Sequence, residues 1–197
     1  MKNFYFIICF SFFLGGMKAQ ILDSLTLDTV FAYTSIAEAM KNPENVIKLE
    51  LDKKKLKTFP LEIFKMKNLQ YLNISKNSIK EIPDSLDLLP NLQYFNAARN
   101  KIEMMPNTIG KMKNLRWLIW NNNNLNSLPH GIGNCEKLEY LDLWSNDLSF
   151  FPETMRNLKN LRLVDLRVIL MNEDFQAKIR EIMPGVTIEM DKACNCK

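Results

Sequence analysis

Apolar residues recur along this chain with a constant period of 23 residues. In five consecutive copies spanning residues 46 to 160, positions 1, 4, 6, 11, 14, 18 and 21 hold 35 residues, all apolar when Ala97 and Cys135 are included. A composition that is 47% apolar does not give this regularity by chance. The pattern predicts a short strand and a return segment in each copy. Neither half can bury its apolar side alone, so the copies stack around one core. The copies and a sixth partial one begin at Val46, Leu69, Leu92, Leu115, Leu138 and Leu161.

Fixed polar residues and prolines mark the turns between these apolar positions. An asparagine follows the predicted strand in four copies, at Asn77, Asn100, Asn123 and Asn146. A buried amide at a bend can satisfy the backbone groups of adjacent turns, so we interpret these residues as a structural ladder. Lys54 and Ile169 replace the asparagine in the first and last copies. The prolines that open the return segments are Pro60, Pro83, Pro106, Pro129 and Pro152.

The chain carries the motif L-x-x-L-x-L-x-x-N-x-L, followed by L-P-x-x-I-x-x-L, and resembles the leucine-rich-repeat family. Within that family it resembles secreted members of the bacterial type. The resemblance implies an α/β leucine-rich-repeat solenoid with a curved parallel β-sheet on its concave face. It also implies recognition of a protein partner through that face. Within the core, Trp120 follows Ala97 by one period, and we expect the indole to fill the space that the alanine leaves.

The segments outside the repeats predict caps and a targeting sequence. The apolar run from Phe4 to Leu14 follows a lysine, which predicts a signal peptide over residues 1–19 and a product that is secreted or periplasmic, without a transmembrane anchor. Residues 20–45 form an N-terminal cap with a helix at about 35–41, opened by Ser35 and Glu38. The repeats then occupy residues 46–171, a helix and strand cap follows at 172–190, and a cysteine-containing tail ends the chain at 191–197.

On the predicted concave face, residues between the core positions form columns with one member per repeat. The third position is aromatic in four successive copies, and Trp144 stands near this column. Tyrosine, tryptophan and arginine often carry binding energy in protein interfaces, so we expect this face to bind the partner. The alternative is that the aromatic rings only stack across strands and stiffen the sheet. The candidate residues are Tyr71, Asn73, Tyr94, Asn96, Arg116, Trp117, Ile119, Tyr140, Asp142 and Trp144.

Composition and the remaining candidates argue against catalysis. The net charge of +4 is too small for dedicated nucleic-acid binding, and the chain contains a single histidine, His130, which we expect in an exposed turn. Cys135 occupies an apolar core position and is interpreted as a small buried hydrophobe. Gly131 and Gly133 lack the context of a nucleotide-binding loop. We therefore expect no catalytic residues, no metal and no cofactor.

Several alternatives stay open from the sequence. Aromatic and amide side chains also suit carbohydrate, and a structural role in an envelope or matrix would use the same fold. An enzyme of the family's ubiquitin-ligase type would need a further catalytic domain. Cys194 and Cys196 fit either a tail with incidental thiols or intermolecular disulfides, which would make an oligomer.

Overall fold

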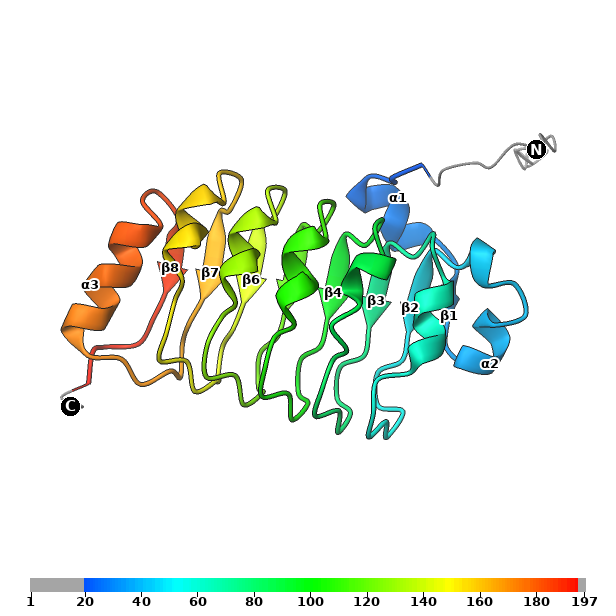
Figure 1. Ribbon diagram of the computed structural model, residues 1–197, viewed down its shortest axis with the longest axis horizontal. Helices are drawn as coiled ribbons and strands as arrows, with labels where there is room; N and C mark the ends of the chain where they lie inside the picture. Colours follow the sequence, from blue (N-terminus) through cyan, green and yellow to red (C-terminus); the bar gives the residue numbers. More distant parts are fainter. Residues whose placement is uncertain (1–19, 195–197) are drawn as a thin grey trace, which may run out of the picture.

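The computed structural model describes residues 20–194, so the predicted signal peptide and Cys196 lie outside the described residues. Eight strands form one sheet in sequence order, and every neighbouring pair is parallel (Figure 1). The leucine-rich-repeat architecture predicted from the sequence is therefore confirmed. The strands are β1 (Ala32–Tyr33), β2 (Lys48–Glu50), β3 (Tyr71–Asn73), β4 (Tyr94–Asn96), β5 (Trp117–Ile119), β6 (Tyr140–Asp142), β7 (Leu163–Asp165) and β8 (Thr187–Glu189).

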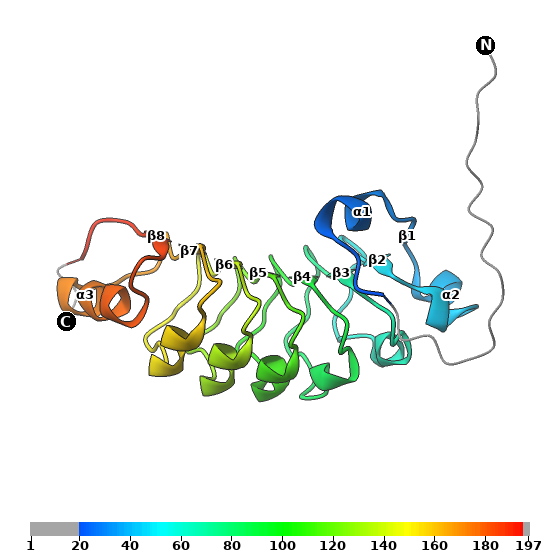
Figure 2. The same ribbon diagram turned by 90° about the horizontal axis from the view of Figure 1, so that it is seen from above.

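Short 3-10 helices return the chain on the other side of the core. Residues 23 apart in the sequence lie opposite each other on neighbouring strands. Tyr94, for example, lies between Tyr71 and Trp117. Seen from above, the sheet lines the inner side of a shallow arc and the return helices lie on its outer side (Figure 2). The return helices are η1 (Pro43–Asn45), η2 (Leu61–Lys65), η3 (Leu86–Leu88), η4 (Asn107–Lys111), η5 (His130–Asn134) and η6 (Glu153–Asn157).

The seven recurring apolar positions form one continuous core between sheet and return helices. Of the 35 residues, 34 are buried, and Leu56 in the first copy is partly buried. Ala97 and Trp120 are both fully buried, and the Trp120 indole meets the Phe95 ring edge-on at 5.3 Å between centroids. The small side chain in one copy thus stands next to the largest one in the next copy.

Each bend asparagine joins two consecutive repeats. The Asn123 Oδ1 accepts from the Ile102 N–H at 3.0 Å, while its Nδ2 donates to the Ala97 carbonyl of the preceding repeat and to the Trp120 carbonyl of its own repeat. Asn77, Asn100 and Asn146 bond in the same way. These amides satisfy backbone groups that water does not reach.

The outer face packs the return helices closely against each other. A Cβ atom added to Gly133 would stand 2.2 Å from the Thr154 carbonyl oxygen, and one added to Gly110 would stand equally close to the Gly131 oxygen. Glycine is required there because the backbones of η4, η5 and η6 approach one another directly. This accounts for the Gly131-Ile132-Gly133 sequence without any ligand.

Both ends of the core are capped. At the N-terminal end, α1 (Ser24–Thr29) and β1 precede α2 (Ile36–Ala39), whose N-cap Ser35 accepts from the Glu38 N–H at 3.1 Å. The sequence predicts a helix at about 35–41 but gives no signal for α1 or β1. At the C-terminal end, α3 (Glu173–Ile182) buries Ile179 and Ile182, and β8 extends the sheet.

The ladder makes a quantitative prediction for Asn100→Ala. The side-chain amide makes four hydrogen bonds in a buried position, so its loss leaves backbone groups without partners. We expect the free energy of unfolding to fall by about 2–4 kcal/mol, measured by denaturant unfolding. Asn124→Ala, at an exposed position one residue after the next ladder amide, is the matched control and should change it by less than about 0.5 kcal/mol. Equal effects of the two substitutions would contradict the ladder.

Candidate partner-binding surface

The open face of the sheet is where the candidate residues gather. Their side chains come from corresponding positions of β3 to β6 and from the residues flanking these strands. All ten are at least partly exposed except Asp142, which is 8% exposed and therefore buried. The structure divides this face into two halves that differ in what covers them.

An N-terminal arm, residues 20–30, lies on the first half. The arm contains α1, which Figure 2 shows on the sheet side of the molecule near β2 and β3. Gln70 accepts from the Leu22 N–H at 2.9 Å and donates to the Gln20 carbonyl at 2.8 Å. Gln93 donates to the Leu22 carbonyl at 2.8 Å and to the Gln70 Oε1 at 2.9 Å. Two side chains of the sheet therefore hold an extended backbone segment.

The arm corrects one expectation about this face. Gln70 and Gln93 occupy the second repeat position on the face that we expect to bind the partner, but they are 0% and 2% exposed. Lys48 also donates to the carbonyl of Asp28 in the arm, at 3.3 Å. This part of the surface is already occupied by the chain itself.

The aromatic column does not stack continuously. The rings of Tyr71 and Tyr94 are parallel and 4.2 Å apart, and the Lys48 ammonium lies 4.6 Å from the Tyr71 centroid. Burial raises the pKa of both phenols above the ordinary value. For this pair the stacking alternative describes the geometry, because each ring already has an aromatic partner.

Trp117 and Tyr140 have different neighbours. The Arg116 guanidinium lies 4.9 Å from the Trp117 ring and forms two hydrogen bonds to Glu139 Oε1, at 2.6 and 2.8 Å. Tyr140 pairs in register with Trp117 on the neighbouring strand. Both rings are half-buried and form no stacked pair with one another or with Tyr94 among the described residues. This half of the column offers aromatic surface that no element of the described chain covers.

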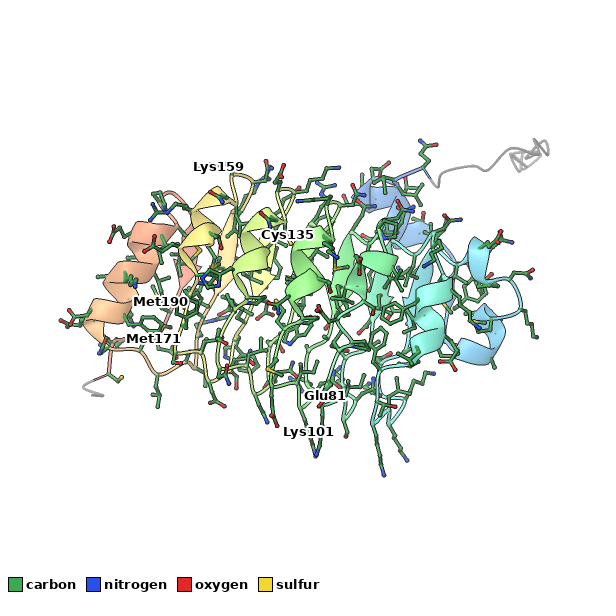
Figure 3. All side chains as sticks on the ribbon, viewed as in Figure 1. Glu81, Lys101, Cys135, Lys159, Met171 and Met190 are labelled. Atoms are coloured by element: carbon green, nitrogen blue, oxygen red, sulfur yellow. The ribbon has the colours of Figure 1, made fainter. Side chains whose placement is uncertain are left out.

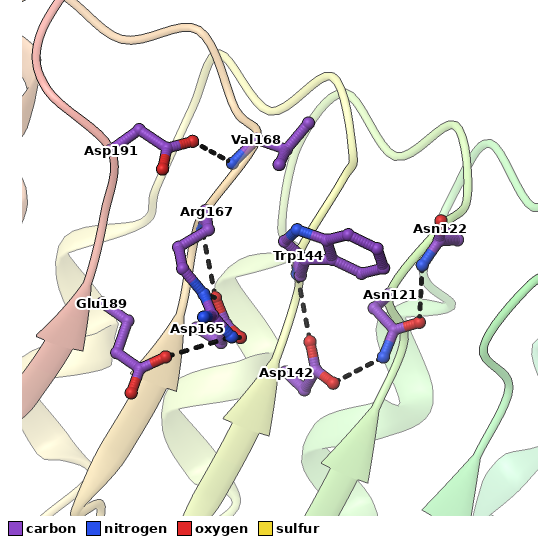
Figure 4. Close-up of polar contacts among 9 residues, drawn as sticks. All are labelled: Asn121, Asn122, Asp142, Trp144, Asp165, Arg167, Val168, Glu189 and Asp191. Atoms are coloured by element: carbon purple, nitrogen blue, oxygen red, sulfur yellow. Dashed lines mark hydrogen bonds and ion pairs between the residues drawn. The ribbon is translucent and has the colours of Figure 1, made fainter.

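Side chains at the fifth repeat position accept backbone hydrogen bonds at the ends of the strands. Asn73, Asn96 and Asp142 each accept the backbone N–H two residues later, at 2.9 to 3.1 Å. Ile119 interrupts the column. Asp142 also accepts from Asn121, and burial raises its pKa above the ordinary value (Figure 4). These side chains therefore fix the backbone just after each strand, in addition to lining the concave face.

A polar network that the sequence did not predict joins the last repeat to the C-terminal cap, beside the open half of the face. Arg167 forms hydrogen bonds to Asp165 at 2.6 and 3.0 Å and an ion pair with Glu189 at 3.2 Å (Figure 4). Burial and the nearby Asp142 and Asp165 raise the pKa of Tyr140 to about 12. The column of Asn and Asp at the fifth position pointed to Asp165, but Glu189 belongs to the cap and has no counterpart in the repeats.

The remaining candidates lie away from this face. His130 is exposed at the start of η5, with its ring 5.7 Å from that of Phe150. Cys135 is fully buried, and burial raises the pKa of its thiol to about 12, which keeps it unreactive. Within residues 20–194, no group of three or more His, Cys, Asp or Glu side chains could hold a metal ion, and no helix is long and apolar enough to span a membrane.

A family model for the leucine-rich repeat region matches residues 45–186. The chain belongs to the leucine-rich-repeat family. Leucine-rich-repeat domains are typical protein-interaction modules and are usually non-catalytic, and the match indicates no catalytic family. No sequence among the curated proteins matches this chain.

Two solved leucine-rich-repeat structures place the fold among its relatives. A leucine-rich-repeat protein of Leptospira interrogans is 27% identical with a TM-score of 0.65, and the match covers 84% of this chain and 49% of that one. The leucine-rich-repeat ectodomain of the Arabidopsis thaliana receptor kinase GASSHO1/SCHENGEN3, solved in complex with Casparian strip integrity factor 2, is 24% identical with a TM-score of 0.57, and the match covers 69% of this chain and 17% of that one. The chain thus spans about half the length of the Leptospira protein and less than a fifth of the receptor ectodomain.

The arm predicts the effect of Gln93→Leu. This change removes the donor to Leu22 and to Gln70, two hydrogen bonds of roughly 0.5–1.5 kcal/mol each. We expect faster amide hydrogen exchange across residues 20–30, corresponding to about 1–3 kcal/mol of lost protection. Arg162→Leu, in the same column but exposed and beyond the arm, is the control and should leave exchange unchanged. Unaltered exchange in the Gln93 variant would show that the amides do not hold the arm.

Proposed function

We propose that this protein is a secreted, non-catalytic interaction module that binds a protein partner through the second half of its concave face. The observation that carries the proposal is the contrast between the two halves. The arm lies on Gln70 and Gln93, whereas Trp117, Ile119 and Tyr140 on the adjacent strands are half-exposed. The arm also supports a peptide-like partner, since the same sheet binds an extended backbone through side-chain amides.

Carbohydrate is the second candidate ligand, and the ring contacts disfavour it. Sugars stack on open faces of aromatic rings. The Tyr71 ring is instead stacked on Tyr94, and the Trp117 ring has the Arg116 guanidinium beside it. A guanidinium next to an exposed indole is typical of protein interfaces. A structural role in an envelope or matrix would use the same surface and would differ in the number and affinity of its partners.

The binding face is tested by capturing partners with the double variant Trp117→Ala/Tyr140→Ala. We expect it to lose the partners that the wild-type protein retains, because both rings belong to the open half, while its unfolding transition stays close to that of the wild type. The control Leu61→Ala/Met104→Ala removes two exposed apolar side chains that lie outside the concave face, and this variant should retain the partners. Capture of the same proteins by the concave-face variant would overturn the assignment.

Secretion rests on the sequence of residues 1–19 and is tested separately. The apolar run after Lys2 predicts export and cleavage after Ala19. Protein recovered from outside the cytoplasm should then begin at Gln20 by N-terminal sequencing. Recovery only in the cytoplasm, with Met1–Ala19 attached, would contradict export and leave the binding face untested by that result.

A further inference from the structure

Eight cations gather on the edge of the solenoid where β2, β3 and β4 end. They lie in three consecutive loops, residues 52–58, 75–81 and 98–104, which we call the basic loop edge. The same loops contain only three acids, Asp52, Glu81 and Glu103. All eight cations are exposed: Lys53, Lys54, Lys55, Lys57, Lys76, Lys80, Arg99 and Lys101.

These cations have no partners within the described part of the chain. None of the eight takes part in a side-chain hydrogen bond or an ion pair among residues 20–194. On the opposite edge, before the strands begin, lysine side chains donate hydrogen bonds to other groups of the protein. Lys113 donates to the Asn134 carbonyl, Lys137 to the Asn114 side chain and Lys159 to the Arg156 carbonyl, each at 2.8 to 2.9 Å. Figure 3 shows Lys101 and Lys159 at these two opposite edges.

The fold supplies an internal comparison for this charge. The eighth repeat position has the same left-handed backbone in all six copies, with φ between 50° and 58°. The first three copies place Lys53, Lys76 and Arg99 there, and the last three place Asn122, Ser145 and Val168. Because the backbone is the same, the cations are a property of the first three copies and not a requirement of the turn.

The backbone holds these side chains in a fixed row. The Lys53, Lys76 and Arg99 N–H groups each donate to a carbonyl of the next loop, at 3.1, 2.9 and 2.8 Å. Neighbouring strands lie about 4.8 Å apart, so the row spans roughly 10 Å across three strands. Cations held this close repel one another unless an anionic surface or polymer neutralises them.

Exposed apolar side chains on the same edge indicate which anion fits. Met104 is 71% exposed at the end of the third loop and lines the same surface hollow as Lys57 and Lys80, whereas Leu170, 84% exposed, extends this edge three copies further on. Aromatic residues, which would favour stacking of nucleic-acid bases, are absent from the three basic loops. Cations next to exposed apolar side chains are typical of proteins that lie on a membrane surface.

We propose that the basic loop edge docks this protein on an anionic lipid bilayer. The lysine and arginine side chains contact the headgroups, and Met104 reaches the interface beside them. The binding is peripheral and electrostatic, so it weakens as salt screens the charges. This contact is separate from the concave face and does not depend on the partner that the concave face binds.

The test uses vesicles of phosphatidylcholine alone or with one-third phosphatidylglycerol, in a sedimentation assay. The chain is taken from Gln20 on, since the apolar run of residues 4–14 would itself bind lipid, and this portion contains the whole sheet and both caps. We expect binding only to vesicles with phosphatidylglycerol, and at least about a tenfold loss when salt is raised to roughly 0.5 M.

The variant Lys53→Asn/Lys76→Asn/Arg99→Asn/Lys101→Asn should reduce that binding at least about tenfold. It should keep its fold, because the fourth copy holds asparagine at the corresponding positions 122 and 124. The control Lys67→Asn/Lys113→Asn/Lys137→Asn/Lys159→Asn removes the same charge from the opposite edge, where Lys67 donates to the Leu88 carbonyl, and should bind as the wild type does. Equal losses in both variants, no binding of the wild type to phosphatidylglycerol vesicles, or binding to heparin or an oligonucleotide but not to vesicles would each overturn the proposal. The salt dependence of the wild type keeps the test decisive if the variant is unstable.

Discussion

The rest of the structure depends on how the backbone is satisfied where the chain bends out of each strand. At that bend, N–H and carbonyl groups enter the core, and side-chain amides supply the partners that water cannot. Asn123 bonds to the Ala97 carbonyl in one repeat and to the Trp120 carbonyl in the next, so it fixes the offset between copies. Once the offset is fixed, equivalent positions of successive copies align in columns, and the apolar positions pack into one core.

The proposed functions therefore rest on the departures from the repeat. The same backbone position carries stacked tyrosines at 71 and 94 and then Trp117, which packs beside Arg116 instead. In the same way, the eighth repeat position, in the turn after each strand, holds a cation in the first three copies and a neutral residue in the last three. A regular scaffold thus presents two different surfaces without any change in its core.

The sequence was sufficient for the parallel sheet, the order of the strands and the core, since each copy repeats the same evidence. It was not sufficient for the arm, because Leu22 and Gln93 are 71 residues apart and the arm has no counterpart in the repeats. It also gave no sign of the contact between Arg167 and Glu189, which joins a repeat to the cap. The even spacing of the aromatic column suggested a continuous strip, yet only Tyr71 and Tyr94 have parallel stacked rings within that column. Ring orientation depends on local neighbours that spacing does not encode.

The two proposed surfaces are compatible because the solenoid separates them by direction. The concave face is the open side of the sheet and points perpendicular to the plane of the strands. The basic loop edge instead lies at one margin of that plane, where β2, β3 and β4 end. A protein resting on that edge would hold its sheet upright and leave Trp117 and Tyr140 open to the side. The arm covers Gln70 and Gln93, which precede β3 and β4, so it lies at the start of strands whose other ends lead into the basic loops. Docking by the edge would therefore orient the binding face without obstructing it.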